Sequence, residues 1–300
     1  MKLTHLLIAA GILLGAGHAQ AEGFSDTWIG IRDGMFVANP GAPPRSARDV
    51  NKVVFEFGHF DTWEYGSNFV HADVLLSDGN EPANNSSAGS TEFYGIYRGQ
   101  LSPDKIFGIN TKIGPFSAIN FEFGLDLETE NTAFAPAKKL LVIGPNFHID
   151  LPQFGFINIG VHASKEWNNN GIATCTGLCQ SNGIPNFGHG GAVSFNVTPE
   201  FEVVWLYHMG WTGLPLDFSG FVNIVLPKGR NGFGQQTATE VLAVPRLSLD
   251  VGKVMGKTPH KLDLYLQVEF WENKFGNDHT LAGNTGMEEV SPQIGIAYHF

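Results

Sequence analysis

The chain has 300 residues and a formal net charge of −11, and its mean hydropathy is −0.04. The acidic balance and the absence of any basic run argue against a nucleic-acid polymer as partner. After the first 21 residues the sequence has no apolar stretch of about 18 residues or more, so it predicts no transmembrane helix.

The N-terminus has the three regions of a secretory signal peptide. Lys2 supplies the positive charge, residues 6–17 form an apolar core, and Ala19-Gln20-Ala21 is a small-residue cleavage site. The apolar core is too short to cross a bilayer as a helix, which needs about 20 residues. The sequence therefore predicts a cleaved signal peptide over 1–21 and a single domain over 22–300. A short membrane anchor is the less favoured alternative.

Apolar and polar residues alternate with a period of two along the rest of the chain. In 117–129 the residues that share the apolar face are Ile119, Phe121, Phe123, Leu125 and Leu127. A soluble sandwich also alternates, but here the polar face mixes acids, bases and histidines over runs of about ten or more residues. That is the length that a tilted membrane strand needs. The pattern predicts an all-β fold, a transmembrane antiparallel β-barrel.

The predicted strands number about twelve, and their connections alternate in length. The strands are expected near 27–37, 50–60, 67–76, 91–101, 116–128, 138–151, 154–167, 189–208, 214–227, 238–253, 260–275 and 288–300. Connections after even-numbered strands are mostly short, and those after odd-numbered strands are long and rich in Gly, Asn and Ser. In outer-membrane barrels the short turns are periplasmic and the long loops extracellular. Segment 102–115 is too long for this rule, and only a folded-in turn is expected there.

The C-terminal strand carries the most specific local signal. Tyr298 and Phe300 share an apolar face with Val290, Ile294 and Ile296. A chain that ends in Phe on such a strand resembles the assembly signal of outer-membrane barrels. We therefore expect a Gram-negative outer-membrane protein whose partners are the barrel-assembly machinery, outer-membrane lipid and lipopolysaccharide.

Several stretches over residues 50–170 resemble one family of outer-membrane channels. They are Asn51-Lys52-Val53-Val54-Phe55-Glu56-Phe57, Phe69-Val70-His71-Ala72-Asp73, Ser102-Pro103-Asp104-Lys105-Ile106, Gly114-Pro115-Phe116, Ile149-Asp150-Leu151-Pro152 and Trp167-Asn168-Asn169-Asn170-Gly171. They are similar to the nucleoside-specific channel-forming proteins, the Tsx-type porins, whereas segment 172–212 departs from that family. The resemblance implies a monomeric twelve-stranded barrel with a narrow polar lumen that passes nucleosides and deoxynucleosides by facilitated diffusion.

Strand parity gives the side chains expected to line the lumen and to contact the solute. They are Trp28, Arg32, Phe36, Glu56, Phe69, His71, Asp73, Glu92, Tyr94, Arg98 and Glu122. Glu56 and Asp73 rank first because both fall inside matched stretches, on neighbouring strands. Two carboxylates so close repel each other unless a cation such as Lys52, Arg32 or Arg98 reaches between them.

Two alternatives stay open for these lumen residues. The charges could form structural pairs across the lumen, such as Arg32 or Arg98 with Glu56 or Glu122, because an ionised group inside a barrel needs a partner or water. Trp28 and Tyr94 could instead be rim aromatics that anchor the barrel at the membrane interface.

Cys175 and Cys179 lie in one predicted loop and could close a small disulfide in the oxidising periplasm, with two free thiols as the alternative. His162 and Ser164 raise the possibility of an outer-membrane phospholipase, but parity turns both into the lumen, so no enzyme is expected. The eleven histidines show no i, i+4 helical pair and no cysteine partner, so no metal and no cofactor are expected. A small general-diffusion porin and a barrel that serves mainly as a surface receptor or structural protein remain the functional alternatives.

Overall fold

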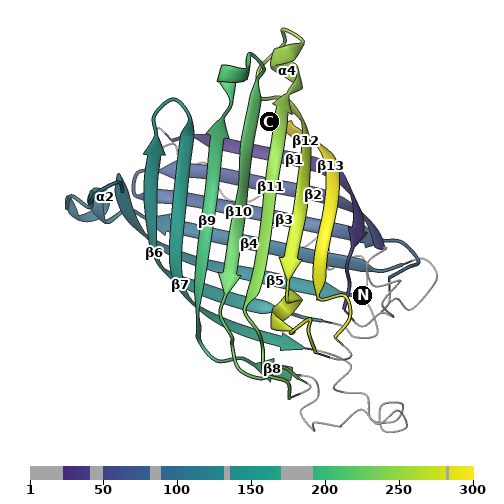
Figure 1. Ribbon diagram of the computed structural model, residues 1–300. Helices are drawn as coiled ribbons and strands as arrows, with labels where there is room; N and C mark the ends of the chain where they lie inside the picture. The colour runs from purple at the N-terminus through teal and green to yellow at the C-terminus, as the bar shows by residue number, and fades with distance from the viewer. Residues whose placement is uncertain are drawn as a thin grey trace, which may run out of the picture.

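The chain folds into a closed barrel of antiparallel strands (Figure 1). The computed structural model describes residues 23–40, 50–81, 89–131, 136–169, 192–232, 234–281 and 284–300. The predicted signal peptide over 1–21 and the loop with Cys175 and Cys179 lie outside the described residues.

Twelve long strands form the wall of the barrel. The long strands are β1 Ser25–Val37, β2 Val50–Trp63, β3 Gly66–Ser77, β4 Thr91–Leu101, β5 Ala118–Glu130, β6 Lys139–Leu151, β7 Gly155–Asn169, β9 Thr198–His208, β10 Leu216–Val225, β11 Glu240–Asp250, β12 Leu262–Glu272 and β13 Glu288–His299, and a thirteenth strand, β8 Ala192–Ser194, is short. The short β8 only extends the pairing at the end of β7, where Asn169 lies opposite Ala192. Each long strand pairs with the next in the chain, and β1 pairs with β13 to close the sheet. The predicted fold class is confirmed.

The predicted strand boundaries differ from the observed ones at two places. The strand expected over 189–208 is divided, because Asn196 donates its backbone N–H to the carbonyl of Lys228 at 2.8 Å and leaves the ladder between β8 and β9. The strand expected over 238–253 ends at Asp250. The Asp250 carboxylate accepts the backbone N–H of Lys253 at 2.8 Å and caps the short helix α4, Val251–Val254.

The two rims of the barrel differ in their connections. On one rim the strands are joined by the short turns after β2 and β6, by the 3₁₀ turn η2 (Gly210–Thr212) and by α4. Segment 102–115 belongs to this rim and contains the helix α2, Pro103–Phe107, which projects from the barrel edge in Figure 1 and does not fold inward. The other rim carries the long connections, including the 3₁₀ turn η3, Lys274–Gly276. We call them the turn rim and the loop rim.

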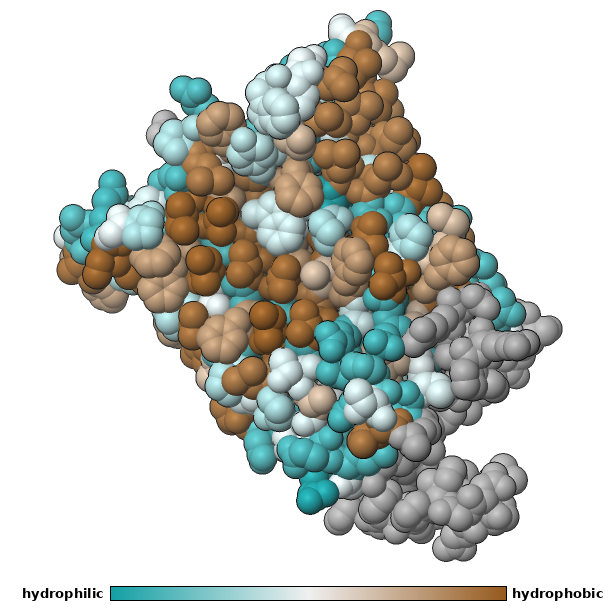
Figure 2. All heavy atoms as spheres, in the orientation of Figure 1, coloured by the Kyte–Doolittle hydropathy of each residue, from teal (hydrophilic) through white to brown (hydrophobic). Residues whose placement is uncertain are grey.

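Alternation separates the two faces of the barrel wall. Large apolar side chains point outward from most of the long strands, among them Ile29, Ile31, Phe55, Phe121, Phe123, Leu141, Ile143, Phe201, Phe218, Leu264, Leu266, Phe270, Ile294 and Ile296. In Figure 2 hydrophobic residues cover the middle of the visible face, and hydrophilic residues gather toward the loop rim. The buried polar residues of the same strands point inward, so the molecule has an apolar outside and a polar inside.

Phe36 is an exception to the predicted parity. The pairing of β1 with β2 shifts register between Gly34 and Val37, and Phe36 has a positive φ of 58°. This bulge turns Phe36 outward, where 55% of it is exposed, and brings Val37 inward in its place. The prediction that Phe36 lines the lumen is therefore wrong.

The terminal strand closes the barrel as well as ending the chain. The backbone N–H of Phe300 donates to the carbonyl of Thr27 at 2.9 Å across the seam between β13 and β1. The rings of Tyr298 and Phe300 are both exposed on the outer face and meet edge to face, with centroids 5.4 Å apart. Their outward direction agrees with their place on the apolar face of the predicted terminal strand. Their role as an assembly signal stays a prediction.

Within the described part of the chain, no helix is long and apolar enough to cross a membrane.

The loop rim should face the outside of the cell if the barrel lies in the outer membrane, as its sequence predicts. An epitope tag inserted after Asn169, at the loop-rim end of β7, is then expected to bind antibody on intact cells. A tag inserted after Gly213, on the turn rim, is the matched control and should bind only after the outer membrane is opened. The reverse labelling pattern would contradict the predicted orientation.

Candidate functional site

A cluster of ion pairs crosses the middle of the lumen. Glu56 on β2 and Asp73 on β3 lie directly opposite each other in the ladder, and the Arg32 guanidinium from β1 reaches between them. Arg32 Nη2 is 2.7 Å from Asp73 Oδ2, Nη1 contacts Glu56 Oε1, and Nε donates to Gln293 Oε1 at 2.8 Å. Of the three cations proposed from sequence to bridge these carboxylates, Arg32 is the one that does so.

Glu56 is the hub of this central cluster. Besides Arg32, it accepts a hydrogen bond from the Tyr265 hydroxyl at 2.6 Å and one from Arg246 Nη2 at 3.3 Å. The Arg246 guanidinium lies 4.0 Å from the centre of the Tyr265 ring. The Glu56 side chain is fully buried and both its oxygens are engaged, so its contacts are those of a structural residue that joins β2 to β1, β11 and β12.

Arg98 organises a second cluster on the other side of the lumen. Its Nη1 lies 2.5 Å from Asp126 Oδ1, and its Nε lies 3.8 Å from Glu122 Oε1. The Tyr94 hydroxyl donates to Asp126 Oδ2 at 3.1 Å, which places Tyr94 inside the lumen and away from the rim. The pairs that the sequence offered as a structural alternative, Arg32 with Glu56 and Arg98 with Glu122, are thus both present.

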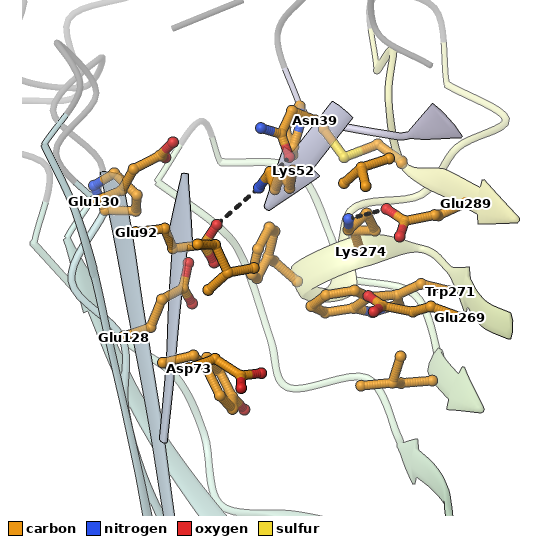
Figure 3. Close-up of a pocket in the computed structure, with 18 of the residues that line it drawn as sticks. Asn39, Lys52, Asp73, Glu92, Glu128, Glu130, Glu269, Trp271, Lys274 and Glu289 are labelled. Carbon is orange, nitrogen blue, oxygen red and sulfur yellow. Dashed lines mark hydrogen bonds and ion pairs between the residues drawn. The ribbon is translucent and has the colours of Figure 1, made fainter. Parts of the chain in front are cut away.

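A cavity of about 750 Å³ occupies the loop-rim half of the lumen, and the central cluster forms its floor. Figure 3 shows Glu92, Glu128 and Glu130 on one wall, with Trp271 and Glu269 facing them. Near the rim, Lys52 pairs with Glu92 at 2.8 Å and Lys274 pairs with Glu289 at 2.5 Å. Carboxylates, two lysines and an aromatic ring therefore face one shared space.

The predicted lumen residues fall into three groups. Those that line the cavity are Arg32, His71, Asp73, Glu92 and Tyr94. Glu56, Arg98 and Glu122 lie behind them in the two clusters. Trp28 and Phe69 lie inward on the turn-rim side of the central cluster, where the ring of Phe69 stacks on that of His71 at 6.2 Å and Trp28 stacks on His299 at 5.8 Å.

Sequence reasoning missed the cavity residues of β5 and β12, chiefly Glu128, Glu130, Glu269 and Trp271. The signal that finds them is the same parity rule. On β12 the inward face that includes Tyr265 and Gln267 continues through Glu269 to Trp271. On β5 the inward face that includes Glu122 and Asp126 continues to Glu128 and Glu130. Following parity to the end of β5 and along β12 names all four residues.

His162 and Ser164 do not form a nucleophile and base pair in the lumen. The Ser164 hydroxyl donates to the backbone carbonyl of Thr198 at 3.2 Å. Nucleophilic catalysis needs the two side chains within hydrogen-bond reach of each other. Their arrangement gives no support to the phospholipase alternative.

The fold is that of known outer-membrane barrels. An outer membrane channel from Pseudomonas putida F1 is similar with a TM-score of 0.51 and 11% identity, over 95% of this chain and 98% of that chain. The translocator domain of the autotransporter NalP from Neisseria meningitidis has a TM-score of 0.40 and 10% identity, over 99% of this chain and 95% of that chain. The KdgM porin has a TM-score of 0.40 and 8% identity, over 91% of this chain and 99% of that chain. No family model and no curated protein matches the sequence. At 11% identity the likeness to the Pseudomonas channel extends to the fold alone.

The central cluster predicts a large loss of stability when Arg32 is replaced. Arg32→Met leaves Asp73 without its bidentate partner and Glu56 with less compensation, and breaking a buried ion pair typically costs about 3–5 kcal/mol. Urea unfolding of the refolded barrel, followed by tryptophan fluorescence, should show a loss of about 3 kcal/mol or more. Arg230→Met is the control, because Arg230 is exposed and its side chain donates to a neighbouring loop carbonyl. Equal unfolding midpoints for the two variants would contradict the assignment.

Proposed function

We propose that this protein is an outer-membrane channel through which small polar solutes diffuse. The observation that carries the proposal is the closed barrel whose outer face is apolar while its lumen holds ion pairs and a cavity of about 750 Å³. Exposed apolar side chains around most of the barrel wall are costly in water and favourable in a bilayer. A lumen rich in charged groups suits a wet interior, since buried ionised groups need partners or water.

The cavity has more acidic than basic side chains, which favours cations over anions. Its carboxylates are Asp73, Glu81, Glu92, Glu128, Glu130, Glu269 and Glu289, and its basic residues are Arg32, Lys52, Arg246 and Lys274. Rings of acidic side chains select for cations in channels. We therefore expect a channel with a modest cation preference that also admits neutral polar solutes.

This preference can be measured as the reversal potential across a planar bilayer under a KCl gradient. The wild-type channel should be cation selective, and Glu128→Gln/Glu130→Gln should move the reversal potential toward zero. Glu272→Gln is the matched control, because Glu272 lies on the same rim but does not line the cavity. No conductance from the wild-type barrel would reject the channel itself and favour a receptor or structural role. Unchanged selectivity in the double variant would reject only the cation preference.

Nucleosides are the solutes that we propose for this channel. The support is the family resemblance of residues 50–170 together with the chemistry of the cavity. A nucleoside offers a flat base and neutral hydroxyl groups, and the cavity offers the Trp271 ring beside carboxylates that accept hydrogen bonds. Stacking of a base on an aromatic side chain contributes about 1–3 kcal/mol. Binding of that strength lets a solute leave as well as enter. The barrel is proposed to act as a monomer.

Replacing Trp271 tests the nucleoside proposal. Trp271→Ala should lower the uptake of radiolabelled nucleoside into proteoliposomes about ten-fold at low concentration, since a loss of about 1.4 kcal/mol is a factor of ten. Ion conductance should change little. Trp211→Ala is the control, because Trp211 lies exposed in η2 on the turn rim. Nucleoside uptake that does not saturate, and that equals sugar uptake in both variants, would favour a general-diffusion porin.

A further inference from the structure

Three metal-ligating side chains converge on the lumen wall beside Arg98. Glu122 on β5, His162 on β7 and Glu202 on β9 each offer one ligand atom, and these three atoms all lie within 4.8 Å of one another. The residues are far apart in the sequence and come from different strands. Residues so far apart form no spacing pattern along the chain that would reveal such a group.

Glycines on the lumen wall make room for this convergence. Gly144 on β6 lies opposite Glu122 in the ladder, and Gly160 on β7 lies opposite Glu202. A Cβ at Gly160 would lie 2.4 Å from Cε1 and 2.7 Å from Nε2 of His162. The imidazole therefore lies in the space above Gly160, and any larger residue there would displace it.

Glu122 and Glu202 share a side-chain hydrogen bond, but several other buried atoms of the group have no hydrogen-bond partner among the described residues. Glu122 Oε2 accepts from Gln100 at 2.8 Å and from Asn146 at 2.7 Å, and these two amides fix the carboxylate. Glu122 Oε1 is buried and unpartnered, as are both ring nitrogens of His162 and the amide oxygen of Asn146. His162 is only 3% exposed, so an unpartnered imidazole there is costly. Several buried acceptors around one point favour a cation between them.

The separation of the ligand atoms fits a bound transition metal. His162 Nε2 lies 3.6 Å from Glu122 Oε1, which is too long for a good hydrogen bond. Two ligands bound tetrahedrally to zinc, each at about 2.1 Å, lie about 3.4 Å apart. One imidazole with carboxylate oxygens is a donor set suited to Zn²⁺ or Mn²⁺.

The excess of carboxylates over cations around Arg98 also favours a bound metal ion. Arg98 is the guanidinium nearest this group, and it already pairs with Asp126 at 2.5 Å. Its charge also acts on Glu200 and Glu202, and Glu122 Oε1 lies 3.8 Å from it. One guanidinium therefore faces four carboxyl groups. A divalent cation would offset much of the negative charge that Arg98 does not neutralise.

We propose that Glu122, His162 and Glu202 bind a divalent transition-metal cation. The ion would tie β5, β7 and β9 together inside the lumen. A second group of one histidine and two carboxylates, Glu56 with His71 and Asp73, is already satisfied. There the Arg32 guanidinium lies between the carboxylates, and His71 Nε2 contacts Asp73 Oδ1 at 3.0 Å. It provides a matched control within the same barrel.

The test is metal binding by the refolded barrel after treatment with a chelator. Calorimetric titration of the wild-type protein with Zn²⁺ should give one tight site, and bound Zn²⁺ should raise the thermal unfolding midpoint. His162→Gln and Glu202→Gln should each weaken that site at least ten-fold and abolish the rise. His71→Gln, the control from the second group, should retain both. The measurement is independent of whether the barrel conducts nucleosides.

Equal binding by wild-type and by His162→Gln would overturn the proposal, as would the absence of a tight site in the wild-type protein. X-ray absorption of the zinc-loaded wild-type barrel covers the case in which a variant does not fold. One imidazole and two or more oxygen ligands are expected around the ion. A ligand set with several imidazoles or with sulfur would place the ion elsewhere and reject the site.

Discussion

The pairing of β1 with β13 is the constraint on which the rest of the structure depends. A sheet whose edges are both paired leaves no row of unsatisfied backbone groups, and only such a closed sheet can cross a bilayer with strands. The seam extends from Trp28 opposite His299 to Gly34 opposite Gln293. Once its register is set, every residue of every strand is assigned to the inside or the outside. The apolar belt and the polar lumen are two consequences of that one closure.

Closure also explains why the lumen charges are paired as they are. Charged groups forced into a narrow interior are stable only if they find partners, because the desolvation of an unpaired ion costs several kcal/mol. Arg32 lies on β1 at the seam, and its partners come from β2, β3 and β13. Glu56 extends the same cluster to Arg246 on β11 and Tyr265 on β12. Such pairs add little net stability compared with apolar packing, but they fix which strands lie side by side.

The sequence predicts the fold well because alternation and loop length are local properties. Nearly every strand was placed within a few residues, and the partners Arg32 and Glu56 followed from parity. Parity misplaces Phe36 because a bulge with positive φ at a phenylalanine has no sequence signature, and the bulge reverses the directions of Phe36 and Val37. The meeting of Glu122, His162 and Glu202 was not foreseen because it depends on how far side chains reach across Gly144 and Gly160. The depth of the cavity was not foreseen for the same reason.

The central cluster divides the aromatic rings of the lumen into two sets, and this bears on how a channel of this shape would work. Trp271 and Tyr94 lie on the loop-rim side, in the cavity, whereas Trp28 and Phe69 lie toward the turn rim. His71 belongs to both sides, since it lines the cavity and stacks on Phe69. A flat solute would therefore have a stacking surface before and after the ion pairs. Conduction is favoured by several weak binding sites along the pore and not by one strong site, because a solute held tightly at one point does not leave it. In such a channel Arg32, already held by three partners, would separate the two sets of rings without competing strongly for the solute.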